Sequence, residues 1–100
     1  MLDRDAIQAL ANELYDAEQS RRQTRAATLT YPDMDMDDAY AVQRAWVDRK
    51  IADGDKITGY KIGLTSRAMQ QAMHIDTPDF GILLESMYYA NNSTINTADF

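Results

Sequence analysis

Lys61 is the side chain of this sequence that is best placed to do chemistry, because a glycine lies two residues before it and another two residues after it. The run Ile57–Thr65 is typical of a β-strand, in which successive side chains point to opposite faces. On one face Lys61 then lies between Gly59 and Gly63, which have no side chains. A glycine inside a strand often marks the close approach of a ligand or of another backbone. The spacing therefore leaves room beside the ammonium group for a small acid.

A second interpretation explains the same spacing. Lys61 can be an exposed lysine on a strand edge, with glycines that serve sheet twist or a bulge. Lysines with a functional role are the minority case, so the residues alone leave both interpretations open. The other face of this strand is mostly apolar and carries Thr58, Tyr60, Ile62 and Leu64.

A long helix is predicted near the start of the chain, over about residues 4 to 22. Apolar side chains recur there with helical spacing: Ile7, Leu10, Ala11, Leu14 and Ala17. Asp3 or Asp5 can open this helix, and carboxylates are favoured at such a position. Arg21 and Arg22 would lie at its C-terminal end, where the helix dipole favours cations.

A second long helix is predicted over about residues 37 to 53, with Gly54 as its stop. Aspartates crowd the start of this helix: Asp33, Asp35, Asp37 and Asp38. They lack the spaced glycine and the distal glutamate of a calcium loop, so a helix start explains them better than a metal site. Trp46 is expected in the core or at a subunit contact. The segment Gln23–Asp33 between the helices is expected to be extended, because Tyr31 precedes a proline.

A short helix, Arg67–Met73, is predicted after the Lys61 strand, with Thr65 or Ser66 as its cap and with Met69, Ala72 and Met73 facing inward. Thr77–Gly81 is expected to turn into a strand at Ile82–Leu84. Met87–Tyr89 is expected to be a further short strand, followed by a polar, turn-rich end. The predicted fold class is therefore α+β: two long helices, a short helix and a few strands.

The composition limits the possible functions. The chain has 100 residues and a formal net charge of −6, and no basic patch is visible, so nucleic acid is not an expected partner. The absence of cysteine excludes thiolate chemistry, and a single histidine, His74, excludes a histidine-based zinc site or a catalytic triad within the chain. No apolar run has the length of a membrane span and the start has no signal-peptide core, so no membrane partner and a cytoplasmic location are expected.

Several segments together resemble the N-terminal part of the 2-oxo-acid hydratase/decarboxylase family, in the fumarylacetoacetase superfamily. These are Gly59–Ser66 and Thr77–Gly81, with Tyr31-Pro32 and Asp38–Gln43 before them. The resemblance covers essentially the whole chain. It implies that residues 1–100 are the N-terminal portion of a longer enzyme with a fumarylacetoacetase-like hydratase fold.

The resemblance also implies a metal site that is absent from this chain. Family members hold one Mg²⁺ or Mn²⁺ with a Glu-x-Glu pair and a further glutamate, in a C-terminal part. This chain contains only Glu13, Glu18 and Glu85, at none of those positions, and the first two are expected on the surface of the first helix. The chain alone is therefore expected neither to hold the metal nor to turn over substrate.

The activity implied by the resemblance is that of a metal-dependent hydro-lyase. Such an enzyme adds water to a 2-oxo or 2-hydroxy-dienoate in aromatic catabolism, and the resemblance favours a member that takes a seven-carbon dioate from homoprotocatechuate. Decarboxylases and pentadienoate hydratases of the same family remain alternatives. A module that uses its helices only for association, without catalysis, is the alternative of another class.

Lys61 and Asp79 are the residues to which the resemblance points for catalysis. Lys61 would stabilise the negative charge of the bound acid or move a proton. Asp79 would act as a general acid or base or would orient Lys61, and its alternative is a simple turn aspartate.

The resemblance implies further contacts with a small 2-oxo-acid substrate. Gly63, Leu64 and Thr65 would line its binding site. Arg25 is a candidate for the second carboxylate of a dioate, because a guanidinium can bind a carboxylate with two hydrogen bonds. Family members form large homo-oligomers, so self-association is expected.

Overall fold

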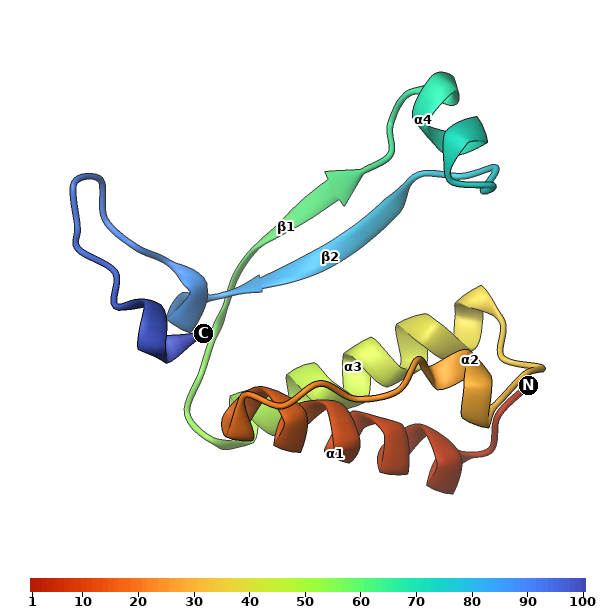
Figure 1. Cartoon of the computed structure of the whole chain (residues 1–100), viewed down its shortest axis with the longest axis horizontal. Helices are drawn as coiled ribbons and strands as arrows, with labels where there is room; N and C mark the ends of the chain where they lie inside the picture. The colour runs from red at the N-terminus through yellow and green to blue at the C-terminus, as the bar shows by residue number, and fades with distance from the viewer. The chain divides into compact units, whose positions relative to one another are not determined.

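The computed structural model describes residues 1–100, and it confirms the α+β class (Figure 1). The chain forms two compact units. A helical unit comprises Met1–Asp53 with Thr94–Phe100, and a hairpin unit comprises Gly54–Ser93. No helix has both the length and the apolar character that crossing a membrane requires.

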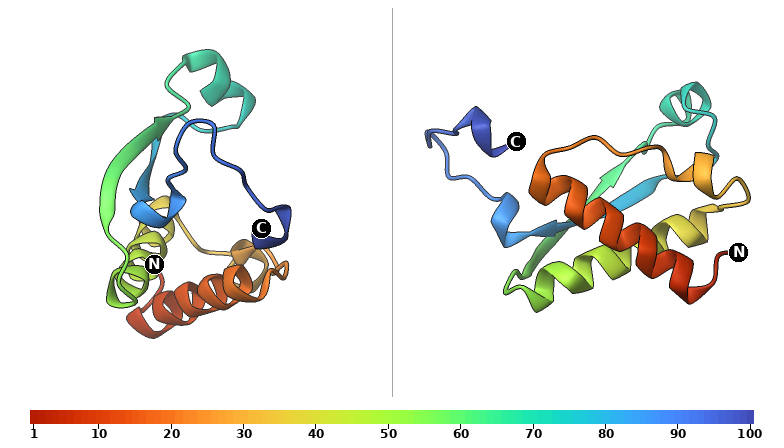
Figure 2. Two further views of the ribbon diagram at one scale, coloured as in Figure 1. Left: turned by 90° about the vertical axis from the view of Figure 1, so that its left-hand side faces the viewer. Right: turned by 60° about the horizontal axis from the view of Figure 1, so that its bottom comes forward.

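The helical unit is built on two helices, α1 (Arg4–Ser20) and α3 (Met36–Ala52), which lie side by side in both Figure 1 and Figure 2. Their contact buries an apolar core of Leu10, Ala11 and Val42. Trp46 is partly buried against this core, as its place on the apolar stripe predicted.

Both long helices begin at the aspartates that the sequence singled out. The Asp3 carboxylate accepts a hydrogen bond from the Ala6 amide at 2.8 Å and caps α1. Asp35 and Asp38 form a reciprocal capping box at the start of α3. The acidic cluster is therefore a helix start, and residues 1–100 contain no group of three or more side chains that could hold a metal ion.

The end of α1 differs from the prediction. The helix stops at Ser20 and not near residue 22, because Arg21 has a left-handed backbone conformation with φ of 56°. The amides of Arg22 and Arg21 then donate to the carbonyls of Ala17 and Glu18, at 3.0 and 3.3 Å. This is a Schellman ending, so both arginines lie beyond the last helical turn.

The linker between α1 and α3 is not extended throughout, which corrects a second prediction. It contains a one-turn helix, α2 (Ala27–Thr30), which is closed by a hydrogen bond of 2.8 Å from the Tyr31 amide to the Ala27 carbonyl. A proline restricts only the residue before it, and Tyr31 indeed lies outside the helix. The residues before Tyr31 were free to form the turn.

The hairpin unit pairs two antiparallel strands, β1 (Ile57–Gly63) and β2 (Asp79–Leu84), joined through a short helix, α4 (Arg67–Ala72) (Figures 1 and 2). Ser66 caps α4 as predicted, with its hydroxyl accepting from the Met69 amide.

Three expectations for this unit were wrong in detail. β1 ends at Gly63 and not at Thr65, because Leu64 has a φ of 53°. The expected turn up to Gly81 is already strand from Asp79 onward, because these residues pair with β1. The predicted strand Met87–Tyr89 is absent: Glu85–Met87 forms a 3-10 turn, with the Tyr88 amide donating to the Glu85 carbonyl.

The apolar side chains of the hairpin unit are more exposed than their patterns predicted. Met69 and Met73 of α4 are 51% and 57% exposed, so they do not face inward. On the sheet, Tyr60 and Ile62 are 66% and 69% exposed. Leu84 is the buried residue of β2, at 1% exposure. The reason is that two strands and one short helix offer too little surface to cover both faces of a sheet.

Candidate active site

The strand register brings Lys61 and Asp79 to the same face of the sheet. Lys61 lies opposite Gly81, and Gly63 lies opposite Asp79. Residues that face each other across an antiparallel pair point to the same side, so these four residues form one continuous surface. In sequence Lys61 and Asp79 are far apart, and pairing of the two strands makes them neighbours.

Gly81 provides the surface on which the lysine lies. A Cβ atom placed on Gly81 would lie 3.0 Å from Cε of Lys61 and 3.4 Å from its Cγ. The methylene stem of Lys61 therefore runs directly over the bare backbone of the opposite strand. A side chain at this position would displace the lysine.

Gly63 is the point at which the two charged groups converge. A Cβ atom placed there would lie 2.5 Å from Oδ1 of Asp79 and 3.5 Å from Nζ of Lys61. The third glycine of this face, Gly59, is more open, with only Cδ1 of Leu83 at 4.0 Å. Of the two glycines that flank the lysine in β1, Gly59 is therefore open apart from this contact, and the Asp79 carboxylate fills the space above Gly63. The predicted lysine between glycines is present, and the glycine that touches its stem comes from the other strand.

The two charged groups lie close together without forming an ion pair. Oδ1 of Asp79 is buried and accepts no hydrogen bond within the chain. A buried acceptor left without a donor costs roughly 1–3 kcal/mol, so a guest that brought a donor to the Asp79 carboxylate would relieve this cost. The ammonium group beside it favours a guest with an anionic oxygen. The arrangement can therefore bind a small acid that also carries a hydroxyl group, with proton transfer at Asp79.

Of the residues predicted to bind substrate, some lie on or next to this surface and others do not. Gly63 belongs to it, and Leu64 follows directly with a positive φ that is uncommon for a bulky residue. Thr65 is exposed beyond the end of β1. Arg25 is exposed on the segment before α2, in the helical unit, and is not part of the hairpin geometry.

The sequence patterns did not predict two residues of the site, Gly81 and Gln70. The sequence predicts Gly81 in a turn, although Asp79 and Gly81 have the same two-residue spacing as Lys61 and Gly63. In a hairpin, two such pairs can face each other, and this was the available signal. Gln70 was not singled out, and its side-chain amide donates to the Leu64 carbonyl at 2.9 Å.

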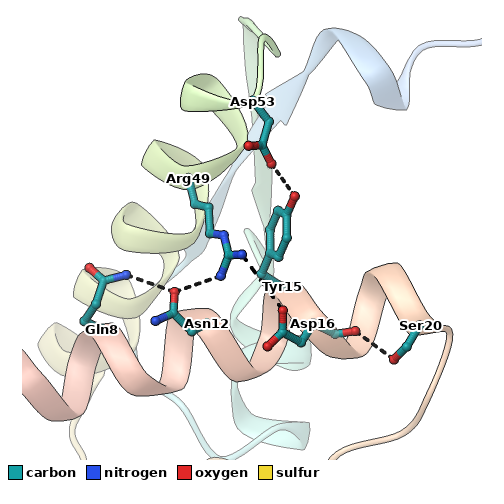
Figure 3. Close-up of polar contacts among 7 residues, drawn as sticks. All are labelled: Gln8, Asn12, Tyr15, Asp16, Ser20, Arg49 and Asp53. Carbon is teal, nitrogen blue, oxygen red and sulfur yellow. Dashed lines mark hydrogen bonds and ion pairs between the residues drawn. The ribbon is translucent and has the colours of Figure 1, made fainter.

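A separate polar cluster ties α1 to α3 in the helical unit (Figure 3). The Arg49 guanidinium lies 3.7 Å from the centre of the Tyr15 ring and donates to Asn12 at 3.0 Å. The Tyr15 hydroxyl donates to the Asp53 carboxylate, and this hydrogen bond raises the pKa of Tyr15 above its ordinary value. All of these groups have partners within the chain, so the cluster holds the two helices together.

Neither place brings together enough side chains to hold a metal ion. No group of three or more histidine, cysteine, aspartate or glutamate side chains within residues 1–100 could hold a metal ion. Glu13 and Glu18 are exposed on α1, where they pair with Thr24 and Lys50. The residues present therefore do not form a metal centre.

No family model matches the chain, but curated proteins do. It is 47% identical over all of its 100 residues to the 2-oxo-hept-4-ene-1,7-dioate hydratase of Escherichia coli. It is 44% identical, over 85% of its length, to a 2-keto-4-pentenoate hydratase of Paraburkholderia xenovorans (strain LB400). The chain spans only 38% and 32% of these two proteins.

A solved structure of a related enzyme has a fold that matches that of this chain. The 4-oxalocrotonate decarboxylase from Pseudomonas putida G7, complexed with magnesium and adipate, matches 86% of the chain with a TM-score of 0.81 at 38% identity. The same decarboxylase complexed with calcium and acetate matches equally well. The chain covers 33% of that protein.

Proposed function

This chain belongs to the hydratase/decarboxylase family of aromatic catabolism, and we propose that within it the chain supplies the Lys61–Asp79 half of a hydratase active site. The observation that carries the proposal is the convergence of an ammonium group and a buried, unpaired carboxylate oxygen over Gly63. Because the chain spans 38% or less of these relatives, the proposal concerns a longer polypeptide that contains it.

The chemistry of a 2-hydroxy-dienoate matches the two groups. Its carboxylate accepts from the Lys61 ammonium, and its 2-hydroxyl donates to the Asp79 carboxylate. Asp79 takes the hydroxyl proton as general base, and the positive charge of Lys61 stabilises the dienolate that forms. Return of this proton from Asp79 to C5 gives a 2-oxo-3-enoate, whose C3–C4 double bond is conjugated with the oxo group. Water then adds across that double bond, with the hydroxyl group at C4 and hydrogen at C3, and gives a 4-hydroxy-2-oxo acid. The solved relative binds magnesium, a Lewis acid, whereas the residues of this chain act as cation and base only.

The proposed substrate is 2-oxo-hept-4-ene-1,7-dioate, the substrate in the name of the hydratase from Escherichia coli, and it reacts as its enol tautomer, a 2-hydroxy-2,4-dienoate. This dioate has a second carboxylate, for which we assign Arg25 as the partner. The decarboxylase is the second candidate, because the solved relative with a TM-score of 0.81 has that activity in its name. Lys61 would then stabilise the dienolate that remains after loss of carbon dioxide, and a C–C bond would break in place of C–O bond formation.

The test uses a polypeptide of the relatives' full length that carries this sequence. Lys61→Met should lower kcat for hydration by about 100-fold or more, because a preorganised charge at the reacting group is removed. Lys56→Met, at an exposed lysine one residue before β1, is the matched control and should keep normal turnover. Near-normal kcat in Lys61→Met would exclude the proposed role, and release of carbon dioxide in place of a hydrated product would favour the decarboxylase.

A further inference from the structure

Gln70 is the residue of α4 that ties this helix to the strand before it. It is the only half-buried residue of the helix, whose other residues are exposed. Its side-chain amide donates to the Leu64 carbonyl at 2.9 Å. Leu64 has a φ of 53°, a left-handed conformation that is sterically unfavourable for any residue with a side chain. The Gln70 hydrogen bond offsets that cost and holds the chain in this conformation directly after Gly63.

The backbone of Gln70 also contacts the segment that leads from α4 to β2. Its carbonyl accepts from the Ile75 amide at 2.9 Å, while the His74 amide donates to Gln71 at 3.2 Å. With a φ of 59° at His74, these bonds form a Schellman ending of α4. They set the direction in which the chain returns toward Asp79 and the start of β2.

We infer that Gln70 is a positioning residue for Lys61 and Asp79. Through Leu64 it fixes the end of β1, and through Ile75 it fixes the return to β2. Both points belong to the connection between the strands, which the last pair of the sheet, Gly63 opposite Asp79, closes. Without the side-chain bond, Leu64 relaxes to a negative φ, the last pair opens, and the Asp79 carboxylate leaves its place over Gly63. The catalytic consequence rests on the proposed function, but the structural one does not.

The structural test is an NMR comparison of this chain with its variants Gln70→Leu and Gln70→Glu. Gln70→Glu keeps the size and helix preference of glutamine but removes the side-chain amide that donates the hydrogen bond. Gln71→Leu and Gln71→Glu are the matched controls, at the exposed neighbour on the same helix. One signal is the strong amide-to-α-proton NOE within Leu64 that a positive φ produces. The other is the NOE between the Lys61 methylenes and the α-protons of Gly81.

Both NOEs should be lost in the Gln70 variants and kept in the Gln71 variants, with unchanged helical circular dichroism in all four. Persistence of both NOEs in the Gln70 variants overturns the positioning role. In the longer polypeptide, kcat should fall at least tenfold in the Gln70 variants, with KM little changed, since misplacement of about 1 Å can cost far more than that.

The two proposals fail separately. If the Gln70 variants lose the NOEs while Lys61→Met retains turnover, Gln70 positions the pair and the proposed function is wrong. If Lys61→Met is inactive while the Gln70 variants keep their NOEs and their turnover, the proposed function holds and the positioning role is wrong.

Discussion

Oδ1 of Asp79 lies 2.5 Å from the point at which Gly63 would carry a Cβ atom. Real Cβ atoms do not approach an oxygen so closely, so the aspartate occupies space that only glycine leaves open. The relation gives Gly63 a specific role, which is to let the carboxylate lie beside the ammonium group of Lys61. It also shows that the glycines of β1 are not equivalent, because Gly59 has no neighbour closer than 4.0 Å.

The first prediction concerns this contact. Gly63→Ala should push the Asp79 carboxylate aside and lower kcat of the longer polypeptide by about 10- to 100-fold, since catalysis is sensitive to displacements of this size. Gly59→Ala is the control, because its methyl group would make only an ordinary contact with Leu83. Equal kcat values in the two variants would contradict the assigned role of Gly63. Thermal unfolding of both variants separates lost activity from lost stability.

The second prediction concerns the choice of substrate. Arg25→Ala should raise KM for the heptenedioate by about tenfold or more, because a charge-assisted hydrogen bond is worth roughly 1.5–3 kcal/mol. It should leave KM for 2-keto-4-pentenoate unchanged, since that acid has no second carboxylate. Steady-state kinetics of the longer polypeptide with both substrates measures the difference, with Arg22→Ala, at another exposed arginine of the same segment, as the control. If both substrates are affected equally, Arg25 does not bind the second carboxylate.

The third prediction concerns the end of α1. Arg21→Gly should raise the free energy of unfolding by about 1 kcal/mol, because glycine adopts the observed left-handed conformation without a steric penalty. The ion pair of Arg21 with Asp99, at 3.9 Å between exposed groups, contributes little against this gain. Arg22→Gly should instead lower stability, since Arg22 does not have a positive φ. Urea unfolding compares the two, and a loss of stability in Arg21→Gly would contradict the explanation of this helix end.

The fourth prediction concerns acid stability. The Leu2 amide donates to the Asp38 carboxylate at 2.9 Å, and this bond, followed by those with Asp35, holds the pKa of Asp38 below its ordinary value of 3.8. The unfolded chain therefore takes up the proton at a higher pH than the folded chain. The stability that Asp38 contributes is fully present above pH 3.8 and is lost as the pH falls through the lower folded-state pKa.

The variant Asp38→Asn tests this. At pH 7 its Tm should be about 5 °C below that of the parent chain, and the difference should shrink toward zero in strong acid. Asp37→Asn, at an exposed aspartate of the same first turn, should show a much smaller difference at any pH. A Tm difference for Asp38→Asn that does not change with pH would show that the charge of Asp38 is not its cause.

Local patterns were enough to predict much of the fold. The aspartate caps of α1 and α3, the stop at Gly54, the Ser66 cap and the strand with Lys61 are all present, because each depends on residues only a few positions apart. The errors at Arg21 and Leu64 have one cause. Both residues adopt a positive φ, which is uncommon for residues other than glycine and is therefore not indicated by the residue type.

The sequence by itself determined the components of the site: a lysine with glycines on its own strand, an aspartate after a proline, and the helices before them. Only the tertiary structure decided how these components meet, because the register of two strands depends on backbone pairing along their whole length. That register set Lys61 against Gly81 and Asp79 against Gly63. Pairing between distant residues is not encoded by local spacing, and this is the physical reason why the contact of Gly81 with the stem of Lys61 required the tertiary structure.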